Sequence, residues 1–254
     1  MTQPPAPALA TGPGLAAFAA LLADDTRAAF CLALLDGRAW TAGELARHAG
    51  VAPSTASAHL TRLVEGGLLT EVRQGRHRYV CLAGPAVAQV VEDMAAHAVP
   101  AAPARTLRAA SAEAAMARAR TCYDHLAGRL GVLVTEAMTR LGLLEQTSGF
   151  ALTREGTEWY AALGIDLAAP RGGNRPVARP CLDFTERRPH LAGTAGAALC
   201  RHALAAEWCV RIGSRRALKV TDAGRQAFSE LFALTPEDLD AVAPRPAVGA
   251  AAAG

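Results

Sequence analysis

Two groups of cysteine, aspartate and histidine stand out among the side chains that could carry chemistry. Each group holds one thiol, one carboxylate and one imidazole: Cys122, Asp124 and His125 in the first, and Cys181, Asp183 and His190 in the second. Thiolate and neutral imidazole are natural ligands of soft and borderline metal ions, with carboxylate as a third. At positions i and i+3, Cys122 and His125 would share one face of a helix. We expect the two groups to face each other and to form a site for a cadmium-, lead- or zinc-type ion.

Other interpretations of these residues remain open. In one, the groove between the groups is an effector pocket for a small organic ligand. Its apolar walls would be Tyr123, Phe184 and Trp208, and its polar anchors would be Arg187, Arg188 and His190. In another, the histidines hydrogen-bond the neighbouring segment and the cysteines pack in the core. Cys200 and Cys209 are expected in the core as well, with a thiol redox sensor as the alternative.

An enzyme is a further alternative, because a cysteine beside a histidine can act as a nucleophile with its base. The sequence contains no glycine-rich phosphate loop, no G-x-S-x-G and no H-E-x-x-H. We therefore expect a protein that is not an enzyme.

The two groups belong to an internal repeat. Cys-Tyr-Asp-His-Leu-Ala-Gly at 122–128 returns as Cys-Leu-Asp at 181–183 and His-Leu-Ala-Gly at 190–193, an offset of 65 residues from the shared histidine. Thr-Arg-Glu-Gly at 153–156 returns as Thr-Asp-Ala-Gly at 221–224, an offset of 68. A strand followed by Thr-x-x-Gly and a helix is a common end of a winged-helix unit. The pattern predicts a duplicated winged-helix-like region, with repeats at about 118–168 and 181–234.

The N-terminal third predicts a second, different set of elements. Asp24 or Asp25 can cap a helix that runs to about Leu35, and Thr41 with Glu44 forms a capping box for a short helix. A third helix, capped near Ser54, ends at the glycine pair 66–67. Two strands near 68–73 and 78–82 and a helix over 85–97 follow. This order is that of a winged helix-turn-helix in a mainly α protein with small β-hairpins.

A winged helix-turn-helix offers a specific way to bind DNA. The outward side of the second helix of the pair enters the major groove, and the wing meets a neighbouring phosphate or the minor groove. The predicted DNA-binding residues are Ser54, Thr55, Ser57, Ala58, His59, Thr61 and Arg62 on the helix, and Arg73, Arg76 and Arg78 on the wing. The alternative is that these residues only face solvent, on the helix and on the hairpin, and do not bind DNA.

Residues 24–82 resemble the ArsR/SmtB family of repressors. The run ELARHAGVAPSTASAHLTRLVEGGLLTEVRQGRHRYVCL at 44–82 carries the resemblance, above all in G-V-A-x-S-T-x-S-x-H-L, L-x-x-x-G-L-L and R-x-G-R-x-x-Y. The resemblance implies a homodimer that binds a palindromic operator on double-stranded DNA and leaves it when an effector binds. A dimer also suits half-sites one helical turn apart.

The family's usual metal ligands are incomplete in this sequence. Metal-sensing members often carry a C-x-C pair in the helix before the turn, where this chain has Glu-Leu-Ala-Arg-His at 44–48. On the last helix only Glu92, Asp93 and His97 remain of a longer pattern of ligands. We therefore expect the effector, an ion or a small molecule, to bind in the C-terminal region.

Composition limits the kinds of partner. The 254 residues are 51% hydrophobic and 19% charged, with a net charge of +3, so DNA binding must be confined to a patch. Residues 101–254 carry a net charge of +4 and residues 1–100 a net charge of −1, which leaves open an architectural DNA-binding protein with a second contact. Six scattered cysteines without C-x-x-C exclude a zinc finger or a disulfide-stapled secreted domain. Neither a signal peptide nor a membrane span is evident, so we expect a cytoplasmic protein with reduced thiols.

Proline- and glycine-rich stretches predict the domain boundaries. They separate a disordered arm at 1–14, a DNA-binding domain at 15–98, a linker at 99–110, an effector-sensing and dimerisation region at 111–234 and a disordered tail at 244–254. A further break at 169–180 separates the two repeats.

Overall fold

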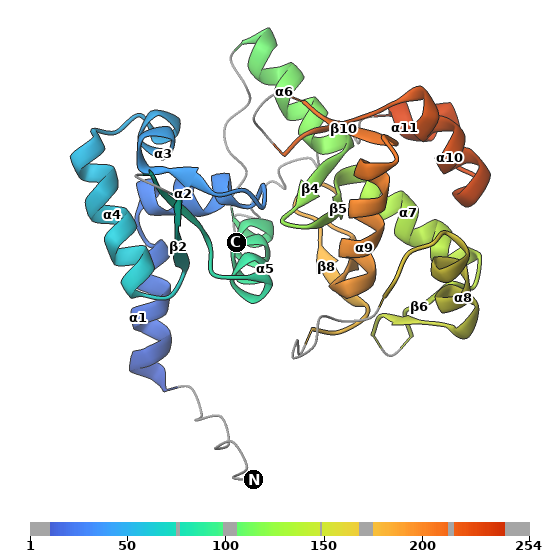
Figure 1. Ribbon diagram of the computed structural model, residues 1–254, viewed down its shortest axis with the longest axis horizontal. Coiled ribbons are helices and arrows are strands. Elements are labelled where there is room, and N and C mark those ends of the chain that lie inside the picture. Colours follow the sequence, from blue (N-terminus) through green and yellow to red (C-terminus); the bar gives the residue numbers. More distant parts are fainter. Residues whose placement is uncertain are drawn as a thin grey trace, which may run out of the picture. The chain divides into compact units, whose positions relative to one another are not determined.

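A computed structural model describes most of the chain (Figure 1). The described residues are 11–74, 77–98, 106–147, 149–167, 175–212 and 216–241. They form two compact units, Met1–Ala88 and Gln89–Gly254. Within the described ranges, no helix has the length and apolarity that crossing a membrane requires.

The first unit is a winged helix-turn-helix. Its elements are α1 (Gly12–Leu22), α2 (Asp25–Leu34), β1 (Trp40–Thr41), α3 (Ala42–Ala49), α4 (Pro53–Glu65), β2 (Leu69–Gln74), β3 (His77–Leu82) and the start of α5 (Pro85–His97). The three strands form an antiparallel sheet in the order β1-β3-β2, and α3 and α4 are the helix pair (Figure 1). The predicted order of elements is confirmed, and the short strand β1 is an addition to it.

Local capping explains where these helices begin. The Asp24 carboxylate accepts the Arg27 backbone N–H at 2.9 Å, and Thr41 and Glu44 form the predicted reciprocal capping box. The predicted cap of α4 near Ser54 was wrong. Ala52 is the N-cap without a side-chain bond, and the fixed φ of Pro53 starts the helix instead.

Helix α1 begins inside the arm predicted at 1–14. Thr11 caps it by accepting the Gly14 N–H at 3.2 Å, while residues 1–10 lie outside the described ranges. The buried Arg27 holds the end of α1 through its Nε, which donates to the Leu21 carbonyl at 2.6 Å. None of the residues of α1 is buried.

The core of the first unit lies between α2, α3, α4 and the sheet. Its fully buried apolar side chains include Phe30, Leu34, Leu45, Leu60, Leu63, Leu68 and Val80. The inner positions predicted for α4 are confirmed, because Ala56, Leu60 and Leu63 are buried. Burial of this face leaves the opposite side of α4 in solvent.

The second unit repeats one order of elements. After α6 (Leu107–Arg118), the first stretch consists of β4 (Arg120–Cys122), β5 (His125–Ala127), α7 (Gly128–Arg140), β6 (Leu144–Glu145), β7 (Ala151–Leu152) and α8 (Arg154–Ala162). The second consists of β8 (Arg179–Leu182), β9 (Pro189–Ala192), α9 (Gly193–Ala205), β10 (Cys209–Arg211), β11 (Leu218–Val220) and α10 (Asp222–Phe232), and α11 (Pro236–Asp240) follows. Each stretch is a hairpin, a helix, a hairpin and a helix. A duplication as the origin of this order stays a prediction.

The boundaries of the elements differ from the predicted segments. Thr106 caps α6, which therefore starts within the predicted linker at 99–110, and β8 starts within the predicted break at 169–180. The division into units falls after Ala88 rather than after residue 98, because α5 from Gln89 onward packs with the second unit. Residues 99–105 and the predicted tail at 244–254 lie outside the described ranges.

The predicted Thr-x-x-Gly motifs open α8 and α10. Thr153 and Thr221 cap these helices by accepting the N–H groups of Gly156 and Gly224 at 2.9 and 3.0 Å. A Cβ at Gly224 would lie 2.0 Å from the Trp208 carbonyl oxygen, so only glycine allows the helix to approach the hairpin this closely.

Replacement of Gly224 by alanine is expected to destabilise the second unit. Gly224→Ala must push helix α10 away from β10, which should cost roughly 1–3 kcal/mol. The control is Gly43→Ala in α3, where a Cβ meets nothing within 4 Å. It should leave the first unit unchanged or stabilise it by up to about 1 kcal/mol. Thermal unfolding measures both, and an unchanged melting temperature for Gly224→Ala would contradict the close contact.

Candidate metal centre and nucleic-acid interface

Four buried side chains of the second unit converge on one point. They are Cys122, His125, Cys181 and His190, and their ligand atoms all lie within 4.8 Å of one another. Cys122 is paired with His125 across β4 and β5, and Cys181 with His190 across β8 and β9. Each hairpin therefore supplies one thiol and one imidazole. We call these four residues the Cys/His centre.

The prediction that Cys122 and His125 share a helix face was wrong. They are opposite residues of a β-hairpin whose two-residue turn is Tyr123 and Asp124. Tyr123 takes the left-handed conformation, with a φ of 56°, which reverses the chain between the two strands. Opposite residues of a hairpin project to the same side of the sheet, so the thiol and the imidazole still point to one place.

Glycines in α7 and α9 lie next to the histidine of the other hairpin. A Cβ at Gly131 of α7 would lie 3.6 Å from the Cβ of His190, and one at Gly196 of α9 would lie 3.3 Å from the Cβ of His125. Each histidine thus packs against the helix that follows the other hairpin. The two imidazole rings lie 5.0 Å apart between centroids.

The spacing of the sulfur atoms matches a tetrahedral ion. The Sγ atoms of Cys122 and Cys181 are 3.7 Å apart. Two sulfurs bound at about 2.3 Å to one tetrahedral zinc ion would lie about 3.8 Å apart. The four ligand atoms therefore suit a closed site with two sulfur and two nitrogen ligands.

The aspartates predicted as ligands lie behind the imidazoles. Asp124 accepts a bond from Arg175 at 2.9 Å, and one of its oxygens lies 3.3 Å from His125 Nδ1. Asp183 is fully buried and forms an ion pair with Arg120 at 2.8 Å, and it lies 3.6 Å from His190 Nδ1. A carboxylate bonded to Nδ1, as Asp124 is to His125, orients the ring and leaves Nε2 to coordinate an ion, whereas Asp183 lies beyond hydrogen-bond distance of His190.

The protonation of the centre favours a thiolate. Burial raises the pKa of Cys122 far above the ordinary thiol value. The pKa of Cys181 is held well below that value, first by the Cys122 thiol and then by the two neighbouring imidazoles. Burial disfavours the charged form of His125, but Asp124 and Cys181 outweigh it and raise the pKa of His125. A thiolate, the form that binds metal, is thus already stabilised here.

Several buried atoms of the centre lack a hydrogen-bond partner. Among the described residues, His125 Nε2 and both ring nitrogens of His190 are buried without one. Buried polar atoms in native proteins are nearly always hydrogen-bonded, so orphaned nitrogens around two sulfurs indicate a missing ligand.

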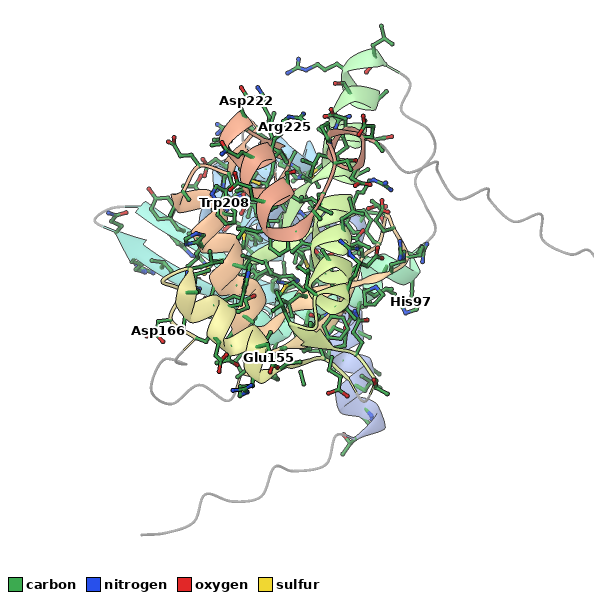
Figure 2. The ribbon with its side chains drawn as sticks, turned by 90° about the vertical axis from the view of Figure 1, so that its right-hand side faces the viewer. His97, Glu155, Asp166, Trp208, Asp222 and Arg225 are labelled. Atoms are coloured by element: carbon green, nitrogen blue, oxygen red, sulfur yellow. The ribbon has the colours of Figure 1, made fainter. Side chains whose placement is uncertain are left out.

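The residues predicted to line an organic-effector pocket make individual contacts. Arg120 stacks on the Phe184 ring at 4.0 Å, and Trp208 packs against Phe228 of the helix that carries Asp222 and Arg225 (Figure 2). Half-buried Tyr123 lies in the β4–β5 turn, Arg187 contacts the Ala96 carbonyl and Arg188 contacts Glu136.

The remaining cysteines are packed as small hydrophobic residues or lie in the wing. Burial raises the pKa of Cys31, Cys200 and Cys209 to about 12 in each case. Cys81 lies in β3, where its sulfur is 3.3 Å from the Thr70 hydroxyl. A protonated, buried thiol is a poor nucleophile, which weighs against the alternative of a redox sensor at Cys200 and Cys209.

The predicted DNA-binding side of α4 faces solvent. Its exposed members are Ser54, Thr55, Ser57, Ala58, Thr61 and Arg62. His59 differs, because it is half-buried and its Nδ1 lies 3.4 Å from Arg27 and 3.8 Å from Asp24.

The wing carries two described arginines. Arg73 is exposed, while Arg78 is bonded to Glu71 on the neighbouring strand, which neutralises part of its charge. Arg76 lies outside the described residues.

Sequence reasoning missed the residues that support the centre. Gln89 of α5 donates to Cys181 Sγ at 3.4 Å, and Arg120 and Arg175 hold the two aspartates. These residues lie far from their partners along the chain, 92 positions in the case of Gln89. The one local signal was Arg120, which lies two residues before Cys122 of the first Cys-x-Asp-His group.

Comparison with known proteins identifies the chain. The chain is 40% identical over 219 residues to YdfF, an uncharacterised HTH-type transcriptional regulator of Bacillus subtilis (strain 168), covering 86% of this chain and 96% of the relative. A family described as "Helix-turn-helix domain" matches residues 22–72. The chain belongs to the HTH-type transcriptional regulators. It is therefore a DNA-binding regulator rather than an enzyme.

Solved structures are similar to part of this regulator. The cadmium metal-sensor CMTR from Mycobacterium tuberculosis is 33% identical and matches 37% of this chain and 99% of its own, with a TM-score of 0.30. The homodimeric winged helix-turn-helix DNA-binding domain of Mb0332 from Mycobacterium bovis is 30% identical and matches 32% and 75%, also with a TM-score of 0.30. NolR from Sinorhizobium fredii is 22% identical and matches 33% and 82%, with a TM-score of 0.31.

Loss of the Asp183 charge is expected to destabilise the second unit strongly. Asp183→Asn leaves the fully buried Arg120 without a counter-charge, which typically costs about 3–5 kcal/mol. The control is Asp240→Asn, which removes the partner of Arg225 in an exposed pair and should leave the melting temperature nearly unchanged. Equal melting temperatures for the two variants would refute the structural role of the buried pair.

Proposed function

We propose that this regulator is a dimeric repressor that leaves its operator when a soft or borderline divalent ion binds the Cys/His centre. The single observation that carries the proposal is the convergence of Cys122, His125, Cys181 and His190 within 4.8 Å, all buried. The ion would be held by two thiolates and two imidazoles. This ligand set binds zinc and cadmium in preference to harder cations. The protein would act in the cytoplasm, where thiols stay reduced.

Two features beyond proximity support a metal rather than an organic effector. The Sγ–Sγ distance of 3.7 Å is that of two ligands on one tetrahedral ion. A carboxylate is bonded to Nδ1 of His125, which is the usual support of a histidine that binds metal through Nε2. Lead and cadmium remain candidates beside zinc, and metal competition distinguishes them.

The exposed side of α4 supports sequence-specific contacts in the major groove. Short hydroxyl side chains such as Ser54, Thr55 and Ser57 lie at and after the helix N-terminus, which suits phosphate contact. Arg62 would reach a base edge or phosphate farther along the groove, and Arg73 and Arg76 would meet the backbone from the wing.

An apolar helix supports the dimer. Helix α1 has the sequence GPGLAAFAALL and no buried residue, and Leu15 is 66% exposed. An exposed helix of this composition marks an association surface. A second copy of the chain would cover it and would bring two recognition helices to a palindrome.

Metal analysis tests the sensing function. Purified, reduced protein incubated with zinc chloride and desalted should retain one ion per chain and bind its operator more weakly than the metal-free protein. Cys181→Ser should lose the ion, because two thiolates are needed to hold it in a buried site. Cys200→Ser, which removes a packed thiol, should retain it. No bound zinc, cadmium or lead in the wild-type protein would exclude the metal and make organic effectors the class to screen.

DNA-binding assays test the interface. Arg62→Ala should weaken binding to an operator selected from a randomised duplex library, by about 1–3 kcal/mol if the side chain reads a base. A phosphate contact would instead lower the salt slope by about one and weaken binding to all sequences alike. Arg154→Ala, at an exposed arginine of α8, is the control and should bind as the wild type. Unchanged affinity for Arg62→Ala would exclude this residue from the interface.

A further inference from the structure

Helix α5 belongs to both units. It begins at Pro85, after a two-residue connection from the end of β3 at Leu82, and its residues from Gln89 onward belong to the second unit. Helix α5 is therefore the covalent connection between the wing and the second unit. The residues of α5 that belong to the second unit contact the surroundings of the two cysteines.

Gln89 contacts the Cys/His centre directly. Its Nε2 donates to Cys181 Sγ at 3.4 Å and to Asp93 Oδ1 at 2.5 Å, and its Oε1 accepts a bond from Arg179 at 2.6 Å. Arg179 lies on β8, the strand that carries Cys181. The amide group of Gln89 thus links α5 both to a ligand atom and to the strand that holds it.

Helix α5 is also tied to the other thiol-bearing strand. The buried Glu92 pairs with Arg216. The backbone carbonyl of Arg216 in turn accepts the backbone N–H of Thr121 at 3.0 Å. Thr121 is the residue before Cys122. One helix therefore contacts the surroundings of both cysteines, with the bond from Gln89 to sulfur as its direct contact with a ligand atom.

We propose that Gln89 is the positioning residue through which an ion at the Cys/His centre changes helix α5 and so the affinity for DNA. This inference rests on the proposed metal-dependent function, and it names the residue that transmits metal binding. An ion can shift a conformational equilibrium only through contacts that differ between the bound and free states. The bond from Gln89 to Cys181 is such a contact.

The physical reason lies in the electrons of the sulfur atom. A divalent ion would take a lone pair of Cys181 Sγ and leave fewer lone pairs to accept the bond from Gln89, so that bond would weaken or change direction. Because Arg179 and Asp93 hold the same amide group, the change reaches β8 and the first turns of α5 together.

The test compares two glutamine variants of the full-length protein. Gln89→Met keeps the length of the side chain and removes both its donor and its acceptor. Gln226→Met is the matched control, because Gln226 makes the same kind of bond to the residue four positions later, Glu230, on the exposed side of helix α10. Zinc affinity is measured by competition with a chromophoric chelator. Affinity for the selected operator is measured by fluorescence anisotropy, with and without saturating zinc chloride.

The wild-type protein and Gln226→Met should lose operator affinity by about 5–150-fold when zinc binds, the usual range of allosteric coupling. Gln89→Met should still bind one zinc ion, with affinity reduced by no more than about 100-fold as for other residues behind metal ligands. Its operator affinity should change less than about threefold on zinc saturation, below that coupling range. This pattern, with equal melting temperatures of the metal-free variants, supports the role of Gln89 in transmission.

Two results would overturn the inference while the proposed function stands. One is a zinc response of Gln89→Met equal to that of the wild type. The other is loss of zinc binding by Gln89→Met, which would make Gln89 a support of the ligand set alone. If the wild-type protein itself binds no zinc, or binds it without any change in operator affinity, the proposed zinc response fails and the inference fails with it.

Discussion

The second unit is organised around the burial of four groups that have few partners other than one another. Two thiols and two imidazoles lie out of contact with water, and three of the four imidazole nitrogens lack a hydrogen bond among the described residues. Burying such groups is unfavourable unless each is paired. The surrounding features lessen that cost: a carboxylate stands behind each ring, and an arginine holds each carboxylate. A divalent ion would satisfy the two sulfurs and Nε2 of each imidazole.

The two units divide the physical tasks. In the first unit, an ordinary apolar core under α4 keeps the opposite, hydroxyl-rich side of that helix exposed for DNA. The second unit uses glycine at the points of closest approach, so that two hairpins and the helices after them can meet around the centre. Helix α5 is common to both units, and its amide and carboxylate side chains hold the strands that carry the cysteines. The two units therefore share one helix.

Local signals in the sequence were reliable where cause and effect are neighbours in the chain. Thr41 and Glu44 predict the start of α3, and Thr153 and Thr221 cap helices, because a cap bonds atoms only a few residues away. The repeated cysteines and histidines also identified the four residues that converge.

The sequence did not predict how those four residues are held. Cys122 and His125 at i and i+3 fit a helix as well as a two-residue hairpin, and Tyr123 in a left-handed turn carries no turn signal. The roles of Asp124 and Asp183 depend on arginines 51 and 63 positions away, and such distant pairing has no periodicity to detect.

The most direct test of the account is X-ray absorption at the zinc edge of the zinc-loaded protein. We predict two sulfur ligands at about 2.3 Å and two nitrogen ligands at about 2.0–2.1 Å. A shell of nitrogen and oxygen ligands without sulfur would contradict the Cys/His centre as the metal site.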